Sequence, residues 1–154
     1  MANYFEGISE LTVDSKGRFA VPVRHREDLI ERCGGRLKIT IDPVQRCLVI
    51  YPMDEWEKIR PVLISLSSLN PAQARVKRAI LGNASDMEMD KGGRLLIPPK
   101  HRKHAAFEKK IVLVGQGNKF ELWNEQHWDE LIDALPEIAL QEGDIPDVLE
   151  SIGL

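Results

Sequence analysis

The chain has 154 residues, 43% of them hydrophobic and 29% charged, which fits a soluble globular protein of one domain or of two small domains packed together. It contains no apolar run long enough to cross a bilayer and begins without the apolar segment of a signal peptide, so we expect neither a membrane protein nor a secreted one. Two cysteines without a C-x-x-C spacing, Cys33 and Cys47, are typical of core thiols in a cytosolic protein.

The charge is distributed unevenly along the chain. The formal net charge is −3, but Glu121–Leu154 holds ten acidic residues and no Lys or Arg. The preceding 120 residues therefore carry 21 basic and 14 acidic residues. A basic body with an acidic tail indicates a polyanion as the partner of the body.

The first predicted element is a β-hairpin around the sequence D-S-K-G at residues 14–17. Apolar residues alternate on both sides of this sequence, which is the two-residue period of strands with one buried face. Asp14 can accept backbone N–H bonds within its own turn, and Gly17 can supply a positive φ. We therefore predict that Leu11–Asp14 pairs with Arg18–Val21.

A short helix and a second hairpin complete this first unit. Pro22 ends the strand, Val23–Cys33 is predicted to be helical, and Gly34 with Gly35 stops the helix. Its expected buried side consists of Val23, Leu29, Ile30 and Cys33. Alternating apolar residues then predict a hairpin of residues 37–41 and 47–51, so the unit reads hairpin, helix, hairpin.

Two connecting helices should follow the first unit. Asp54 is expected to open the first, and Pro61 to kink or end it. The second should run from the cap Asn70 to Gly82 and carry a basic side made of Arg75, Lys77 and Arg78.

The second unit repeats the first at an offset of 76 residues. Six of 19 aligned pairs between Leu11–Leu29 and Met87–Ala105 are identical: Asp14/Asp90, Gly17/Gly93, Arg18/Arg94, Pro22/Pro98, His25/His101 and Arg26/Arg102. The offset falls to 72 by the pair Trp56/Trp128, so four residues are missing between the second helix and its hairpin. Asn124 should cap a final helix, ahead of the acidic tail. The pattern indicates an internal duplication.

No arrangement of residues favours catalysis, a cofactor or a metal. His101 and His104 are three residues apart but lack a third ligand, and solvated or core-edge histidines are the better interpretation. No nucleophile elbow, dinucleotide fingerprint or Walker loop occurs, and paired carboxylates are found only in the acidic tail. We expect neither an enzyme nor a small-molecule substrate.

The two D-x-x-x-R turns are the candidate site. Turn geometry alone explains the Asp and Gly residues, and Arg18 and Arg94 could simply form ion pairs with the two Asp residues. It does not explain why both copies keep an arginine and add Lys16 or Lys91. Arginine offers a planar fork that matches phosphate and guanine edges. Two such turns on a rigid sheet could lay basic side chains along a duplex groove, as other β-ribbon proteins do. The predicted DNA-binding residues are Asp14, Lys16, Arg18, Asp90, Lys91 and Arg94, with the two Asp residues shaping the turns and orienting the arginines.

Several motifs together make the chain resemble the MraZ family, transcriptional regulators with two tandem AbrB-like (SpoVT-AbrB) half-domains. They are the duplicated D-x-x-x-R turns, L-G-N-A-S, G-R-L-L-I-P and K-F-E-L-W-N-E-x-x-W, and the resemblance spans Gly7 to about Leu135. It implies a swapped-hairpin, barrel-like core, a ring-shaped homo-oligomer, and binding to direct repeats upstream of the division and cell-wall gene cluster, including its own gene. The chain departs from the family pattern at His101, where a large apolar residue is usual, and at Gly92-Gly93, which should loosen the second turn.

The sequence thus predicts a β-rich α+β protein of two pseudo-repeated units with connecting and C-terminal helices. The expected parts are a first half-domain at 8–55, a helical connector at 56–83, a second half-domain at 84–127, and a C-terminal helix with acidic tail at 128–154. The expected function is sequence-specific binding of double-stranded DNA in the cytoplasm, in association with the nucleoid. The alternative is an antitoxin-like protein-interaction module that grips its partner with the acidic tail.

Overall fold

The computed structural model describes residues 4–137 and 147–152, and the fold is β-rich α+β, as predicted. The strands are β1 (Ile8–Thr12), β2 (Arg18–Ala20), β3 (Arg36–Ile41), β4 (Leu48–Pro52), β5 (Ser85–Glu88), β6 (Arg94–Leu96), β7 (Lys110–Gly115) and β8 (Phe120–Asn124). The helices are α1 (Val23–Cys33), α2 (Met53–Ile64), α3 (Pro71–Gly82), α4 (Pro99–His104) and α5 (Glu125–Ala134), followed by the 3-10 turns η1 (Leu135–Glu137) and η2 (Asp147–Ile152). Among the described residues, no helix has the length and apolar character needed to span a membrane.

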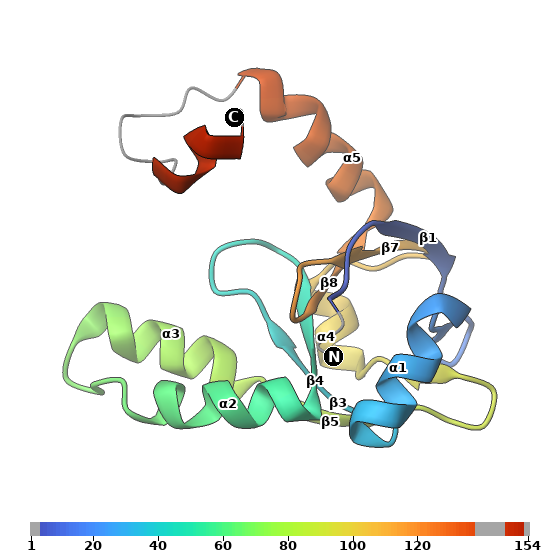
Figure 1. Cartoon of the computed structure of the whole chain (residues 1–154), viewed down its shortest axis with the longest axis horizontal. Coiled ribbons are helices and arrows are strands. Elements are labelled where there is room, and N and C mark those ends of the chain that lie inside the picture. Colours follow the sequence, from blue (N-terminus) through green and yellow to red (C-terminus); the bar gives the residue numbers. More distant parts are fainter. Residues whose placement is uncertain (1–3, 138–146, 153–154) are drawn as a thin grey trace.

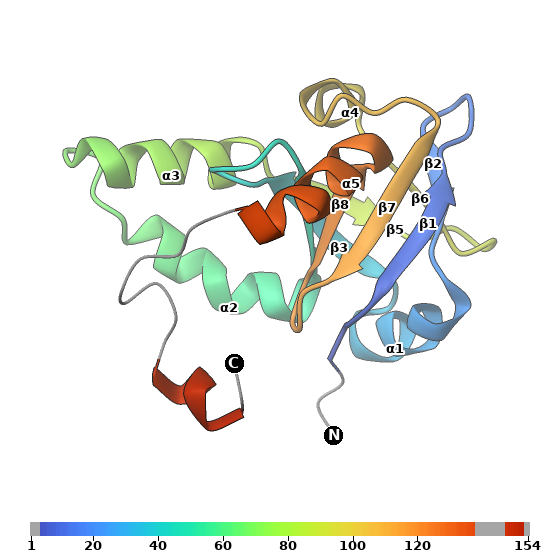
Figure 2. The same cartoon turned by 90° about the horizontal axis from the view of Figure 1, so that it is seen from above.

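Six strands form one antiparallel sheet in the order β1-β7-β8-β4-β3-β5, and β2 and β6 form a separate two-stranded ribbon (Figures 1 and 2). The predicted hairpins β3–β4 and β7–β8 are confirmed. Every other ladder joins a strand of the first unit to a strand of the second: β1 with β7, β3 with β5, β4 with β8, and β2 with β6. The two units therefore exchange strands within one chain.

The predicted pairing of Leu11–Asp14 with Arg18–Val21 is wrong, although the turn between them forms. Leu11 lies opposite Ile111, and Phe19 lies opposite Leu95. The turn is a local structure that its own residues can make, whereas the flanking strands gain more apolar burial against the other unit. No ladder joins β1 to β5 in the described part of the chain, so closure of the sheet into a barrel stays a prediction.

The exchange gives the molecule an approximate local two-fold symmetry. Phe19 lies opposite Leu95, its counterpart at an offset of 76, and β4 pairs with its own counterpart β8. The offset is 74 between the first residues of β3 and β7 and 72 between those of β4 and β8. The four missing residues are therefore lost in two steps, two before the second hairpin and two within it.

One core is shared by both units. It contains Phe19, Leu29, Ile39 and Ile50 from the first unit together with Leu95, Ile97, Ile111, Leu113 and Leu122 from the second. Each half supplies strands that cover apolar side chains of the other, which agrees with the marginal core expected of a unit of this size. The shared core fixes the β2–β6 ribbon and the turns at its ends.

Helix α1 buries a different face from the predicted one. Leu29 and Cys33 are buried as expected, but Val23 is 75% exposed and Ile30 is 58% exposed. The third buried residue of α1 is His25, which completes an i, i+4, i+8 stripe with the other two. The His25 ring packs edge-on against Phe120, with ring centroids 5.0 Å apart, so an aromatic contact takes the place of an aliphatic one.

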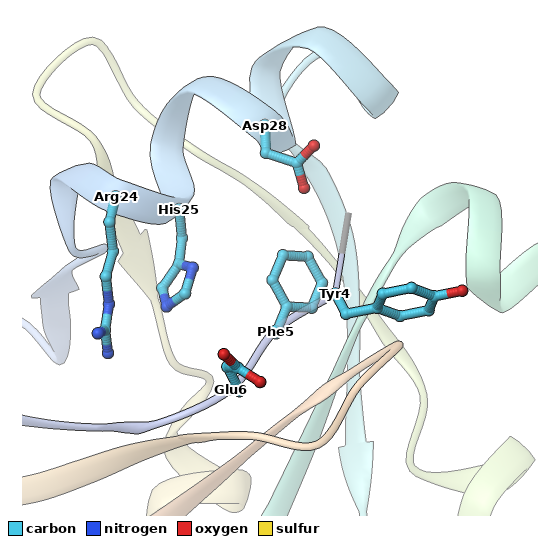
Figure 3. Close-up of a pocket in the computed structure, with 6 residues that line it drawn as sticks. All are labelled: Tyr4, Phe5, Glu6, Arg24, His25 and Asp28. Carbon is cyan, nitrogen blue, oxygen red and sulfur yellow. The ribbon is translucent and has the colours of Figure 1, made fainter. Parts of the chain in front are cut away.

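The N-terminal segment packs between α1 and the β7–β8 hairpin (Figure 3). The Phe5 ring stacks on Phe120 at 4.1 Å between centroids, and the Phe5 backbone exchanges hydrogen bonds of 2.7 and 2.8 Å with Gly117. Gly115 has no side chain where this segment crosses, and a Cβ there would overlap the Glu6 amide nitrogen. In Figure 3 the Phe5 ring points toward α1, beside His25, while Tyr4 points away.

Helices α2 and α3 project from the sheet as a pair, away from the β2–β6 ribbon (Figures 1 and 2). Helix α2 begins at Met53 and not at Asp54, and it continues through Pro61 to Ile64. Helix α3 is capped as predicted, because the Asn70 side chain accepts the Gln73 amide. None of the residues of α3 is buried, so much of the pair faces solvent.

Candidate nucleic-acid interface

The first turn is held together by one carboxylate that accepts three hydrogen bonds. Asp14 Oδ1 accepts the amides of Lys16 and Arg18, both at 2.9 Å, and Asp14 Oδ2 accepts Arg18 Nε at 2.9 Å. The Asp14 amide also donates to the Arg18 carbonyl at 2.8 Å, and the Gly17 amide donates to the Asp14 carbonyl at 3.0 Å. Arg18 is therefore fixed at its Nε, and the described residues provide no hydrogen bond to its two terminal amino groups.

The second turn has the same geometry. Asp90 Oδ1 accepts the amides of Gly92 at 2.9 Å and Arg94 at 2.8 Å, while Asp90 Oδ2 accepts Arg94 Nε at 3.0 Å. The backbone bonds between Asp90 and Arg94 (2.9 Å) and between Gly93 and Asp90 (3.0 Å) match those of the first turn. The Gly92-Gly93 pair was expected to loosen this turn, but it leaves all five bonds in place.

The fourth position of each turn favours glycine because of its backbone conformation, and an arginine side chain lies against it. Gly17 and Gly93 have φ values of 89° and 76°, in the left-handed region that side chains disfavour. A Cβ on Gly17 would lie 2.7 Å from Arg102 Cζ, and one on Gly93 would lie 2.5 Å from Arg26 Nε. An arginine from the other unit therefore covers each turn: Arg26 of α1 lies on the second, and Arg102 of α4 lies on the first.

Sequence reasoning did not assign a role to these two arginines. Arg26 and Arg102 are one of the six identical pairs, which is the signal that could have singled them out. Their contact with the opposite turn depends on the strand exchange, which no local pattern shows. Arg26 Nε donates to the Val21 carbonyl at 2.6 Å, just past the end of β2, and so links α1 to the ribbon as well as to the second turn.

The two turns, whose sequences contain the six predicted DNA-binding residues, lie on one side of the molecule, away from the α2–α3 pair (Figures 1 and 2). Because β2 and β6 are antiparallel, one turn precedes each strand and the turns lie at opposite ends of the ribbon. Lys16 and Lys91 are exposed but do not occupy equivalent positions, since Lys16 aligns with Gly92 and Lys91 with Ser15. The two turns thus have the same backbone conformation but carry their lysines at different positions.

The turn geometry also sets the charge of the two acids. The pKa of Asp14 is lowered, first by the hydrogen bond from the Arg18 amide, with further lowering by the Arg18 side chain. The pKa of Asp90 is lowered in the same way, first by the Arg94 amide. Both carboxylates are therefore ionised at neutral pH, and each remains an acceptor for its arginine.

His25 of α1 and His101 of α4 are buried and have packing roles. His101 is buried, and its Nε2 donates to the Asn83 carbonyl at 2.7 Å, which links α4 to the residue that follows α3. The hollow between α1 and the N-terminal segment is lined by Tyr4, Phe5, Glu6, Arg24, His25 and Asp28 (Figure 3). Arg24 lies at the edge of this hollow and donates to Ser9 Oγ at 2.8 Å, so this arginine links α1 to β1.

One group of described residues could offer three metal ligands: Asp42, Cys47 and Glu121, whose ligand atoms lie within 4.8 Å of one another. Asp42 Oδ1 already accepts two backbone amides at 2.8 Å, those of Val44 and Gln45. Glu121 accepts Trp123 Nε1 at 2.9 Å. The pKa of the Cys47 thiol is raised by burial, then by the two nearby carboxylates, so the thiol stays protonated. The positions of all three side chains are therefore explained by hydrogen bonding and burial, without a metal ion.

The fold and the site together define a class: two tandem units that each contain an Asp–Arg turn, a helix and a hairpin, and that exchange strands so that both turns border one shared ribbon. The chain belongs to the MraZ family. The family model described as "MraZ protein, putative antitoxin-like" matches residues 4–79 and, a second time, residues 80–148. The two matches correspond to the two units found in the sequence.

Relatives similar over nearly the whole chain carry the name transcriptional regulator MraZ. The protein from Halorhodospira halophila is 46% identical over 151 residues, covering 97% of this chain and 99% of the relative. The proteins from Pseudomonas aeruginosa LESB58 and Pseudomonas putida F1 are 44% and 45% identical over 148 residues, each covering 96% of this chain and 98% of the relative.

Proposed function

We propose that this protein is a transcriptional regulator that binds double-stranded DNA sequence-specifically, without catalysis, through its two Asp–Arg turns. One observation carries the proposal: both turns fix an arginine by its Nε alone, and the two turns lie on the same side of the molecule (Figure 2). A guanidinium held in this way keeps both terminal amino groups for a bidentate contact with a phosphate or with guanine O6 and N7. The names of the relatives support the regulatory role.

The six residues of the turns have different proposed roles. Arg18 and Arg94 contact base edges or phosphates, and the exposed Lys16 and Lys91 add phosphate contacts. Asp14 and Asp90 hold the arginines in place without facing the DNA themselves, because their oxygens are already occupied by the turns. DNA binding would place the protein at the nucleoid.

One subunit offers only a few contacts to DNA, so we propose that several subunits act together as a ring-shaped homo-oligomer on direct repeats in a promoter. Tethered subunits facing repeated sites gain affinity through effective concentration. The projecting α2–α3 pair is suited to self-association: α3 buries no residue, and Val62, Ile64 and Leu69 are 62%, 57% and 96% exposed.

The test is a gel shift at moderate salt on a duplex that carries the promoter repeats upstream of the gene of this chain. The parent protein should give a defined complex that a scrambled duplex does not compete away. The pair Arg18→Ala with Arg94→Ala should abolish this complex, since each lost guanine contact costs about 1–3 kcal/mol. The matched control is Arg46→Ala with Lys109→Ala, which removes the same charge from exposed positions outside both turns and outside the α2–α3 pair. Equal binding by the turn variant and the parent would refute the proposal.

The second candidate is a protein-interaction module, favoured by the antitoxin-like description of the family and by the acidic tail. Residues 138–146 and 153–154 of that tail lie outside the described residues. Deleting residues 138–154 separates the two functions. Loss of a protein partner in a pull-down, with DNA binding kept, would support the interaction module as a second activity.

A further inference from the structure

The outward face of the β2–β6 ribbon is continuous with both turns. Phe19 and Leu95 point inward, being 1% and 2% exposed. Side chains alternate along a strand, so the outward face carries the remaining ribbon residues: Arg18, Ala20, Arg94 and Leu96. The two arginines of the proposed site therefore share one small face with two apolar residues.

The ribbon register puts each arginine beside one of these apolar residues. The Val21 amide donates to the Gly93 carbonyl and the Ile97 amide to the Gly17 carbonyl, both at 2.9 Å, which marks those two pairs as hydrogen-bonded. The pairs Arg18–Leu96 and Ala20–Arg94 alternate with them and are non-hydrogen-bonded, the kind in which opposite side chains lie closest. Leu96 is thus the immediate neighbour of Arg18.

This face has the two chemistries that read a major groove. A two-stranded ribbon fits into the major groove, where arginine recognises guanine and an apolar side chain recognises the C5-methyl of thymine. Leu96 is 56% exposed and so is open to such a contact. The face also carries no carboxylate, because Asp14 and Asp90 lie in the turns and are tied to backbone amides.

The local two-fold symmetry exchanges Arg18 with Arg94 and Ala20 with Leu96. If only the arginines contacted DNA, a subunit could lie on its site in either of two opposite directions with the same contacts. Leu96 breaks this equivalence, because its counterpart Ala20 is too short to reach as far from the ribbon. A direct repeat requires each subunit to lie in the same direction, and a large apolar residue at one end of the face supplies that direction.

We infer that the outward face of the β2–β6 ribbon reads bases, with Leu96 contacting a thymine methyl and setting the direction in which each subunit lies on its site. This inference rests on the proposed DNA-binding function and adds a specificity residue to it.

The test uses the promoter-repeat duplex made in two forms, one with thymine and one with deoxyuridine, which lacks the C5-methyl. The parent should bind the deoxyuridine form at least three-fold more weakly, since burying one methyl is worth about 0.8 kcal/mol, or about four-fold. Leu96→Ala should bind the thymine duplex at least three-fold more weakly than the parent does. It should bind the thymine and deoxyuridine duplexes with equal affinity. Ile30→Ala, which removes a similarly exposed aliphatic side chain from α1, should behave as the parent.

An exchange variant tests the direction of binding. Ala20→Leu with Leu96→Ala moves the large side chain to the other end of the face, so sensitivity to deoxyuridine should move to the opposite half of the site when thymines are replaced one half at a time. Equal affinity of the parent for both duplexes, or discrimination retained by Leu96→Ala, would overturn the inference. If Arg18→Ala with Arg94→Ala bound as well as the parent, the proposed function itself would fail, which is a separate outcome.

Discussion

At the scale of single residues, one carboxylate organises each turn. Asp14 Oδ1 accepts two backbone amides while Oδ2 orients Arg18, so the acid determines both the shape of the turn and the direction of the guanidinium. Asp90 repeats this arrangement with Arg94. The shape of the arginine side chain should therefore matter as much as its charge.

Arg18→Lys tests the importance of shape. Lysine keeps the charge but loses the planar fork and the Nε bond to Asp14, so specific affinity should fall about ten-fold or more, as expected for about 1–3 kcal/mol per bidentate contact. Affinity for unrelated duplex DNA, which depends on charge, should stay near that of the parent. Titrations of both duplexes by fluorescence anisotropy make the comparison. An equal fall on both duplexes would argue against base reading by Arg18.

The adjacent glycines of the second turn provide a matched pair for stability. Gly93→Ala places a Cβ at a φ of 76° and against Arg26, and it should cost about 2 kcal/mol in the free energy of unfolding. Gly92→Ala meets no atom closer than 3.4 Å and has no positive φ, so it should be neutral or slightly stabilising. Urea unfolding of both variants measures the difference. A destabilised Gly92→Ala variant would show that the second glycine is also required.

At the scale of elements, the sequence predicted what its neighbouring residues determine. The two turns, the β3–β4 and β7–β8 hairpins and the Asn70 cap depend on contacts within a few residues, and all of them form. The partners of β1 and β2 lie more than 70 residues away, and apolar alternation alone cannot distinguish a local partner from a distant one. The roles of His25 and of Arg26 depend on those distant pairings and were missed for the same reason.

The contact of α4 with the first turn predicts a specific energetic coupling. Arg102 covers Gly17 and should couple to Arg18, whereas Arg26 covers Gly93 and should couple to Arg94. A double-mutant cycle of Arg102→Ala with Arg18→Ala, measured by DNA affinity, should give a coupling energy of about 0.5–3 kcal/mol. The cycle of Arg102→Ala with Arg94→Ala is the control and should be additive. Equal coupling in both cycles would contradict the cross-unit arrangement.

The packing of α1 on the N-terminal segment predicts a dependence of stability on pH. The pKa of His25 is lowered from its ordinary value of about 6.5, first by burial and then by Arg24, with Asp28 opposing the shift. The unfolded chain therefore binds this proton more readily than the folded one. The contribution of neutral His25 to stability is fully present above pH 6.5 and is lost as the pH falls through 6.5 toward the lower folded value.

Unfolding at a series of pH values between 7.5 and 5 measures this effect. The parent should lose stability as the pH falls, and His25→Phe, which keeps an aromatic ring beside Phe5 and Phe120, should lose less over the same interval. An unchanged slope in the variant would show that other groups cause the pH dependence.

At the scale of the whole molecule, the strand exchange makes the two units one cooperative structure. Among the residues that the structure describes, four ladders join the units, and only the β3–β4 and β7–β8 hairpins lie within a single unit. A fragment of residues 1–83 would retain β1, β2 and β3 without β7, β6 and β5. Its exposed strand edges and uncovered core residues should prevent it from folding alone.

Separate expression of residues 1–83 and 84–154 tests this dependence. Each fragment alone should lack a cooperative unfolding transition in far-UV circular dichroism. An equimolar mixture should regain the sheet and unfold at a temperature that rises with concentration, because folding is then coupled to association. DNA binding should return with the fold, since the ribbon needs β2 from one fragment and β6 from the other, and each turn needs the arginine of the opposite unit. A fragment that unfolds cooperatively alone would mean that each half-domain is independently stable and that the exchange adds only assembly.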